Sequence, residues 1–408
     1  MEIISLKNLT IDNHRIEYEF QCPKRFIKYL KSDECKIILE YPNCDLSKIP
    51  QGVLMVPFVG NILIVSMLMD ISIEVPVLDK TFYESLPQIK RAFQKMYSYL
   101  NFNFNVKVDK LEDCRYDISP NKSLFFTGGL DATSALINTY KEKPILINIW
   151  GGDTNTKDLD SHNHLENYLK QITSALDLQY QFIKSNCREM YNEPKVSKFL
   201  ATRIAPWNNH GWWASIAHIL SMTTLLAPLV YEKRIGTHYI GSSYTKSSNT
   251  FDANNNILLE SIKFSSCNLK GVDGDLTRID KAKKIIEFSK KNEVPLELNV
   301  CWYKTKGQNC SHCEKCYRTI LELIVNRGDP NQFGFTINDQ TYEDICLFLK
   351  NNYVNKEFWK SIINTFKIDK EYWQMNPQIK WILNVNINSP RVLLRKIYFT
   401  TKRMLSVK

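Results

Sequence analysis

From Ser123 onward, short apolar strand patterns alternate with amphipathic helix patterns, and this alternation constrains the fold most strongly. The strand patterns lie at Ser123–Phe126, Pro144–Trp150, Tyr180–Ile183 and Thr237–Gly241, and the helix patterns at Ala132–Tyr140, His162–Leu176 and Gly211–Tyr231. Alternating strands and helices are typical of βαβ units, so we expect an α/β fold with a mostly parallel sheet. Ligands bind such sheets at the carboxyl ends of the strands.

The regions on either side of this core have different patterns. Short strand patterns come first, and a helix pattern over Phe82–Leu100 follows them; the strand patterns are Glu2–Leu6, Ile16–Phe20, Lys36–Glu40 and Ser72–Val75. The C-terminal region is helical and rich in aromatic residues. We therefore expect an N-terminal α+β domain over residues 1–115, a core over 116–325 and a helical C-terminal cap over 326–408.

The stretch Ile49–Met69 contains no charged residue and is long enough to cross a bilayer. Two prolines and two glycines interrupt it, at Pro50, Gly52, Pro57 and Gly60. We expect these residues to split the stretch into a strand and a short buried helix, which argues against a membrane span.

Composition excludes several classes of protein. With 44% apolar and 24% charged residues among 408, the chain has the composition of a globular protein and not of a disordered one. Eleven cysteines are too few for a disulfide scaffold of this length, and the polar start of the sequence differs from a signal peptide. We expect a reducing, cytoplasmic location.

The net charge of +10 is concentrated near the C-terminus. No acidic residue follows Glu371, whereas Lys380, Arg391, Arg395, Lys396, Lys402, Arg403 and Lys408 do. The nearly neutral remainder argues against a nucleic-acid partner. The basic residues alternate with apolar ones from Val392 to Phe399, so the tail is predicted either to contact an anionic membrane or polyanion, or to dock as a helix with solvated cations.

The segment Thr127–Thr133 (TGGLDAT) joins the first core strand to a helix. Its adjacent glycines let backbone N–H groups approach an anion, and the helix N-terminus adds unpaired donors. Thr127 and Thr133 offer hydroxyl groups to phosphate oxygens. The segment is neither a Walker A loop nor a dinucleotide fingerprint, and a purely structural strand–turn–helix remains the alternative.

A second motif is the spacing Cys301-x8-Cys310-x2-Cys313-x2-Cys316. Four thiolates within reach of one another suit a tetrahedral Zn²⁺ and leave no open position for catalysis, so we expect a structural zinc. An iron–sulfur cluster is the alternative. We expect His312, inside the motif, not to be a ligand.

The loop resembles the SGGxDS loop of the PP-loop ATP pyrophosphatases, which cleave ATP to AMP and pyrophosphate while adenylating a substrate. Thr127 stands at the first Ser of that motif and Ala132 at the second. Together with the cysteine motif it resembles the 7-cyano-7-deazaguanine synthase (QueC-like) family of the queuosine pathway, over about residues 120–325. The segment Tyr239–Thr245 (YIGSSYT) is similar in placement to that family's nucleotide-side strand.

This resemblance implies a parallel-sheet core of the adenine nucleotide alpha hydrolase-like (HUP) type and an AMP-forming, ATP-dependent C–N ligase. The substrate would be a small, deazaguanine-like carboxylic acid, joined to ammonia or an amine as an amide or nitrile. The implied cofactors are ATP, Mg²⁺ and Zn²⁺, and a homodimer is implied as well. Catalytic roles fall on Asp131, Thr127 and Thr133, and nucleotide contacts on Thr127, Gly128, Gly129, Leu130, Asp131, Ala132, Thr133, Gly241 and Ser242; Asp131 would order the loop or meet the Mg²⁺.

Three other functions stay open: amidation of sugar acids in glycan assembly, tRNA thiolation, and a non-catalytic nucleotide-binding scaffold, which Ala132 favours. A protein is a further possible acceptor of the activated group, and so a possible partner. Several residues carry weaker hypotheses. Arg203, Asn208, Asn209 and His210 would face the nucleotide or cap a helix; Asp153 would approach the adenosine or only form a turn; His162 and His164 are expected at the helix surface; Cys187 and Cys267 would carry sulfur or simply be buried.

Overall fold

In the computed structural model of the protein, the described residues are 2–103, 105–204, 211–243, 255–303, 306–388, 390 and 394. The chain forms two compact units. The first comprises Met1–Phe126, Asn138–His162 and Leu169–Asp275, and the second Thr127–Ile137, Asn163–Tyr168 and Leu276–Lys408.

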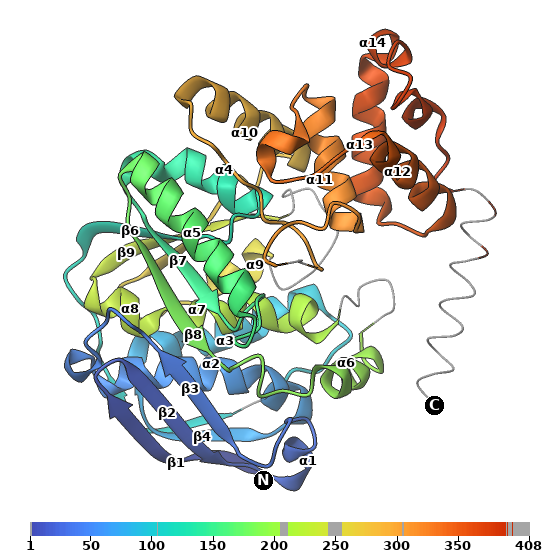
Figure 1. The fold of residues 1–408 in the computed structure, drawn as a ribbon. Coiled ribbons are helices and arrows are strands. Elements are labelled where there is room, and N and C mark those ends of the chain that lie inside the picture. Colours follow the sequence, from blue (N-terminus) through green and yellow to red (C-terminus); the bar gives the residue numbers. More distant parts are fainter. Residues whose placement is uncertain are drawn as a thin grey trace. The chain divides into compact units, whose positions relative to one another are not determined.

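The first unit is built on a ten-stranded, mixed and mostly parallel sheet (Figure 1). The strand order is β10-β9-β6-β7-β8-β3-β2-β1-β4-β5. The strands are β1 (Ile3–Asp12), β2 (Arg15–Gln21), β3 (Lys36–Glu40), β4 (Ser72–Asp79), β5 (Val106–Glu112), β6 (Ser119–Phe125), β7 (Ile145–Trp150), β8 (Tyr180–Ser185), β9 (Ile235–Gly241) and β10 (Asn268–Val272). The expectation of an α/β fold with a mostly parallel sheet is confirmed.

The five strands from β6 to β10 are all parallel to their core neighbours. The chain runs outward from β6 through β7 to β8 and then returns to β9, on the other side of β6. The direction of winding therefore reverses between β6 and β9, where Leu124 lies opposite Tyr239. In open α/β sheets, the crevice at the carboxyl ends of such a strand pair is the usual place for a ligand.

The N-terminal strands continue the same sheet through an antiparallel junction between β3 and β8. Only Leu39 and Glu40 pair there with residues of β8, and an ion pair between Lys184 and Glu40 (3.1 Å) supports the contact. The side chain of Asn186 extends the ladder, because its Oδ1 accepts from Ile38 N (2.8 Å) and its Nδ2 donates to the carbonyl of Lys36 (3.2 Å). One sheet thus joins the N-terminal strands to the strands of the region where strands and helices alternate.

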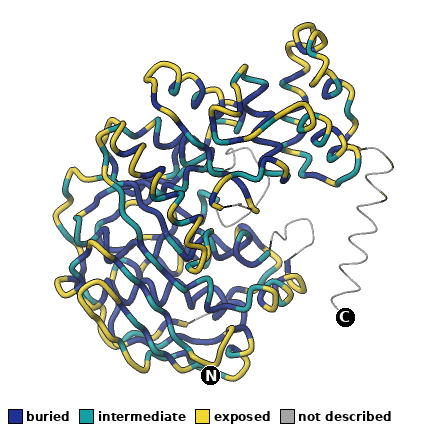
Figure 2. The backbone as a smooth tube through the Cα atoms, viewed as in Figure 1, coloured by how far each residue is buried: buried dark blue, intermediate teal, exposed yellow. Residues whose placement is uncertain are grey.

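Helix α2 (Gln51–Met69) runs without interruption through the uncharged stretch, so the expected split into a strand and a short helix is wrong. Pro57 lies inside the helix, and Asn61 Nδ2 donates to its carbonyl (2.9 Å). The helix packs against β4, α7 and α8, and Figure 2 shows it buried along its length. Burial on every side explains the failure: an all-apolar helix has no polar face to mark its period.

Two helical stretches are long and apolar enough to cross a membrane, and both lie mostly inside the protein. The most apolar window of Gln51–Met69 is 100% buried and that of Trp213–Glu232 is 89% buried. The second stretch was expected as a single helix. It consists of a π-helical segment η4 (Trp213–Ala217), α7 (His218–Thr224) and α8 (Ala227–Glu232), and Pro228 is the second residue of the last helix.

The remaining helices of the first unit complete its cover. They are α1 (Lys24–Ile27), η1 (Leu46–Lys48), α3 (Lys80–Met96), η2 (Tyr140–Glu142), α6 (Glu193–Ala201) and α9 (Asn256–Ser261). The apolar face expected of α3 is buried, including Leu86, Ile89, Phe93 and Met96. A single hydrophobic core extends through this unit from Ile4 to Leu269.

The helices α4 (Leu130–Thr139) and α5 (Leu159–Leu176) contribute to both units. The rest of the second unit is helical, as expected for the C-terminal region: α10 (Arg278–Asn292), α11 (Glu314–Val325), η5 (Pro330–Phe333), α12 (Asp339–Asn351), α13 (Lys356–Ile368), α14 (Lys370–Gln374) and η6 (Lys380–Asn384). Trp359 is fully buried, and its Nε1 donates to Glu314 (3.1 Å), which fastens α13 to α11. Most of the basic tail, from residue 395 onward, lies outside the described residues.

Candidate functional site

The TGGLDAT loop begins two residues after β6 ends at Phe125, and it leads directly into α4. The first helical hydrogen bond runs from Thr133 N to the carbonyl of Gly129 (2.8 Å). The backbone N–H groups of Leu130, Asp131 and Ala132 precede this bond, so they have no acceptor within the helix. Together with the positive end of the helix dipole, they offer a set of donors to an anion.

Each glycine of the loop has a different structural reason. Gly128 has a φ of +73°, in the left-handed region, and a Cβ there would lie 3.1 Å from Cβ of Asn299 and 3.3 Å from the Tyr168 ring. Gly129 has no positive φ, and a Cβ there would meet the Thr127 hydroxyl at 3.3 Å. Gly128 is therefore needed for the turn itself, whereas Gly129 leaves open the space in front of the helix.

The hydroxyl of Thr127 closes the turn, since its Oγ1 accepts from Gly129 N at 3.3 Å. Leu130 is almost fully buried and anchors the start of α4. Ala132, where the resembled motif has Ser, is half-buried.

Two buried polar side chains of the loop region have no hydrogen-bond partner among the described residues. One is Thr133, which is fully buried and whose Oγ1 is unsatisfied. The other is Asn299, whose Oδ1 and Nδ2 are both buried and unsatisfied. A buried unsatisfied polar group costs about 1–3 kcal/mol, so two of them beside one loop point to a ligand that completes their hydrogen bonds.

The carboxylate of Asp131 is held by two cations of α10. Lys281 Nζ lies 2.8 Å from Oδ1 and Arg278 Nη1 lies 3.0 Å from Oδ2. Arg278 also binds Glu322 through Nε (2.9 Å), and Glu322 is buried. Two acids and two bases therefore form a neutral, largely buried network. Of the two roles expected for Asp131, these contacts favour ordering the loop, because its oxygens already have partners.

The predicted nucleotide contacts Gly241 and Ser242 belong to the first unit, where β9 ends. Gly241 pairs with Val272 of β10, and Ser242 N donates to the carbonyl of the same residue (2.9 Å). The Ser242 side chain is buried. Both residues thus lie at the carboxyl end of β9, the neighbour of β6 in the sheet.

The four predicted metal ligands, Cys301, Cys310, Cys313 and Cys316, lie together, and all four sulfur atoms are within 4.8 Å of one another. Three of the Sγ–Sγ distances are 3.5, 3.8 and 3.9 Å. A tetrahedron with Zn–S bonds of about 2.3 Å has edges of about 3.8 Å, so the cluster fits this geometry. The cluster could hold a metal such as zinc. No other group of three or more His, Cys, Asp or Glu side chains within the described ranges does so.

Backbone amides around the cluster stabilise thiolates. Cys301 Sγ accepts from Tyr303 N (3.1 Å) and Cys310 N (3.4 Å), and Cys313 Sγ accepts from Cys316 N (3.5 Å). Cys313 is also the N-cap of α11. The hydrogen bond with Cys316 lowers the pKa of Cys313 below that of an ordinary thiol. His312 is exposed, and its Nδ1 forms a hydrogen bond with the carbonyl of Cys310 (2.6 Å).

The weaker candidates have structural partners. Asp153 accepts from Trp213 Nε1 (3.0 Å) and lies near Arg188 and His218, so it is more than a turn residue. His162 stacks on Trp150 with a centroid distance of 3.8 Å. His164 Nε2 bonds to Glu297 (2.7 Å).

Both histidines are thus half-buried and partnered, unlike the surface residues expected. Arg203 is exposed and lies over the Phe199 ring. Asn208, Asn209 and His210 lie outside the described residues.

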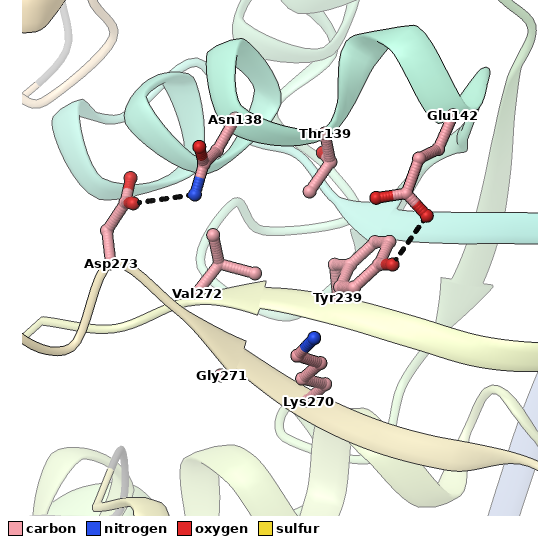
Figure 3. A pocket seen from close by; sticks show the side chains of 8 residues that line it. All are labelled: Asn138, Thr139, Glu142, Tyr239, Lys270, Gly271, Val272 and Asp273. Carbon is pink, nitrogen blue, oxygen red and sulfur yellow. Dashed lines mark hydrogen bonds between the residues drawn. The ribbon is translucent and has the colours of Figure 1, made fainter.

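Sequence reasoning missed a polar pocket in the first unit, between the end of α4 and strands β9 and β10 (Figure 3). Its volume is about 220 Å³, below the usual range of roughly 300–1,000 Å³ for ligand pockets. Tyr239 donates to Glu142 (2.8 Å), and burial together with this bond raises the pKa of Tyr239 to about 12. Asn138 Nδ2 donates to Asp273 (3.0 Å). The sequence signal for this pocket would be the alternating polar residues of β10. This pattern is weak in so short a strand, and β10 was therefore not predicted.

No protein-family model matches the chain, and no curated protein matches it either.

Proposed function

We propose that this protein is an ATP-dependent ligase of the PP-loop type, with a HUP-like core, that adenylates a small carboxylic acid and then forms a C–N bond. One observation carries the proposal: the Gly128–Gly129 turn leads from a central parallel strand into a helix whose first amides have no acceptor within the helix, and the buried side chains of Thr133 and Asn299 at this turn have no hydrogen-bond partner among the described residues. The sheet also reverses its winding at this strand. Both features suit the phosphates of a nucleotide.

The loop would hold the β- and γ-phosphates of ATP. The N–H groups of Leu130, Asp131 and Ala132 would donate to phosphate oxygens, as would the Thr133 hydroxyl. Mg²⁺, when bound, would neutralise charge on the phosphates. Because Asp131 is already neutralised by Lys281 and Arg278, its negative charge would repel the phosphates less than a free carboxylate would.

The expected reaction has two steps, transfer of the adenylyl group to the carboxylate and transfer of the acyl group to the amine. An oxygen of the substrate carboxylate bonds to the α-phosphorus of ATP, and the bond from that phosphorus to pyrophosphate breaks. Ammonia or an amine then attacks the acyl carbon, AMP leaves with the carboxylate oxygen, and the nitrogen loses a proton. Positioning and electrostatic stabilisation carry most of such catalysis, so the reaction does not require a strong general base in the loop.

Within this proposal the four cysteines would hold Zn²⁺ in a structural role. Four thiolate ligands complete the coordination of a tetrahedral ion and leave no position for water. The bound metal would stabilise the knuckle between Cys301 and α11. A deazaguanine-like acid remains the substrate that the two motifs together suggest.

The tRNA-thiolation alternative is disfavoured by the state of the two isolated cysteines. Cys187 and Cys267 are buried, and burial raises the pKa of each thiol to about 12. Sulfur transfer requires an accessible thiolate. The scaffold alternative keeps its support from Ala132, and sugar-acid amidation would use the same loop chemistry.

The test is to identify the nucleotide products formed from ATP and Mg²⁺ with a panel of carboxylic acids, including 7-carboxy-7-deazaguanine and uronic acids, and ammonium. We expect AMP and pyrophosphate, dependent on one acid. ADP and phosphate would contradict the proposal. ATP binding without turnover by any acid, unchanged in Ala132→Ser, would favour the scaffold.

A further inference from the structure

The segment from Leu298 to Cys301 connects the cysteine cluster to the TGGLDAT loop within the second unit. Asn299 N donates to the carbonyl of Gly128 at 2.7 Å, and the Asn299 carbonyl lies 3.8 Å from the place of a Cβ on Gly129. Two residues later the chain reaches Cys301, whose Sγ lies 3.8 Å from that of Cys313. A four-residue segment therefore touches the loop at one end and supplies a cluster ligand at the other.

The side chain of Asn309 fixes this segment. Its Oδ1 accepts from Val300 N (3.0 Å) and Cys301 N (3.1 Å), and its Nδ2 donates to the carbonyl of Leu298 (2.5 Å). Leu298 N in turn donates to the carbonyl of Phe333 (3.0 Å). With backbone groups on both sides of Asn299 bound, the segment has little freedom, so the position of Cys301 determines that of Asn299.

The side chain of Asn299 is unsatisfied where it meets the loop. Both polar atoms of its amide are buried and have no partner among the described residues, and its Cβ lies 3.1 Å from the place of a Cβ on Gly128. On α4, Thr133 is fully buried, and its hydroxyl also has no partner among the described residues. Both side chains therefore indicate that a ligand completes their hydrogen bonds at the N-terminus of α4.

We propose that Asn299 is a nucleotide-binding residue whose amide N–H donates to a phosphate oxygen at the loop, and that the four-cysteine metal cluster sets its position. The inference rests on the proposed function for the identity of the ligand. It adds a binding residue that neither sequence motif contains, and it gives the metal a role at the nucleotide site in addition to holding the knuckle.

The binding test uses the full chain with its metal, and isothermal titration calorimetry with ATP and Mg²⁺. We expect Asn299→Ala to weaken ATP binding about 10-fold, the equivalent of one hydrogen bond to a charged acceptor. Asn299→Asp, which keeps the shape and replaces the donor by a negative charge, is expected to weaken it more. Gln308→Ala is the matched control, because Gln308 is exposed in the same knuckle; its affinity should stay within about 2-fold of wild type.

The metal test measures amide hydrogen exchange of residues 127–134 before and after chelation, and again after Zn²⁺ is restored. We expect faster exchange in the metal-free protein, weaker ATP binding, and recovery of both with metal. Asn309→Ala should speed loop exchange without loss of metal, because Asn309 is not a ligand. Circular dichroism of each variant separates local loosening from a failure to fold.

The outcomes separate the two hypotheses. If wild-type protein does not bind ATP, the proposed function fails, and the nucleotide role of Asn299 fails with it. If wild-type protein binds ATP but the Asn299 variants bind equally well, only the role of Asn299 is wrong. Loop exchange that is unchanged by chelation and by Asn309→Ala would overturn the coupling to the metal, whatever the ligand.

Discussion

Lys281 and Asp131 form a buried ion pair: Nζ lies 2.8 Å from Oδ1, and the Lys281 side chain has no exposed surface. Arg278 binds the second carboxylate oxygen, so two cations of α10 hold the first turn of α4. The sequence separates these partners by about 150 residues, and this contact gives Asp131 a structural role in the loop.

Asp131→Asn should strongly destabilise the protein. The substitution removes one charge of the pair and leaves Lys281 buried without its counterion, which typically costs about 3–5 kcal/mol. Urea denaturation monitored by circular dichroism measures the change. Glu287→Gln is the control, because Glu287 is exposed and its nearest cation, Lys283, lies 3.9 Å away; its stability should change by less than about 0.5 kcal/mol. Equal stability of the two variants would contradict the importance of the pair.

The two loop glycines should respond differently to alanine. Gly128→Ala places a Cβ at φ +73° with contacts at 3.1 and 3.3 Å, so we expect a loss of about 1–3 kcal/mol in unfolding free energy. Gly129→Ala has no positive φ and brings its Cβ to 3.3 Å from the Thr127 hydroxyl, so its unfolding free energy should stay within about 1 kcal/mol of wild type, whereas ATP binding should weaken because the Cβ obstructs the anion. Thermal denaturation and calorimetry with ATP separate the effects. A stable Gly128→Ala would refute the strain argument, and full ATP affinity in Gly129→Ala would refute the anion site.

The free energy of unfolding should decrease as the pH falls below the ordinary pKa of histidine. His238 is fully buried on β9, where its Nδ1 lies 2.7 Å from the Ser123 hydroxyl oxygen. Burial lowers the pKa of His238 to about 3. The unfolded chain therefore binds a proton at pH values where the folded chain does not, so this residue's stabilising effect is complete above about pH 6.5 and is lost toward pH 3. The slope contributed is at most about 1.4 kcal/mol per pH unit.

Urea denaturation at pH 7, 6 and 5 measures this slope. His238→Gln should have a shallower dependence on pH because its side chain does not titrate. Gln308→Ala, at an exposed position whose side chain does not titrate, should keep the wild-type slope. If the slope is the same in wild type and both variants, His238 is not the group responsible.

Metal should be retained by the cysteine cluster at one equivalent per chain. Cys313→Ser removes a ligand and should abolish retention and lower the melting temperature, whereas Cys346→Ser changes a buried cysteine outside the cluster and should keep the metal. Mass spectrometry of the metal content checks both. Iron and sulfide in place of zinc would identify the alternative cluster, and retention by Cys313→Ser would argue against tetrahedral coordination.

Local patterns predicted the elements that have one buried face. Strand β3 spans the predicted Lys36–Glu40, and the apolar stripe of α3 was found at its helical spacing. The cysteine spacing predicted the cluster, because close spacing and a helix start bring three of its ligands together. Strands β5 and β10 were missed, since edge strands are short or largely exposed and have a weak pattern.

The sequence by itself determined the α/β class, the turn at Gly128–Gly129 and the grouping of the four cysteines, because each depends on residues close together in the chain. Only the tertiary structure decided that α2 is one buried helix, that Asp131 pairs with Lys281, and that Asn299 lies against Gly128. These relationships join residues far apart in sequence through burial and charge pairing. No local periodicity records them, since the energy of a buried pair depends on where the rest of the chain places its partner.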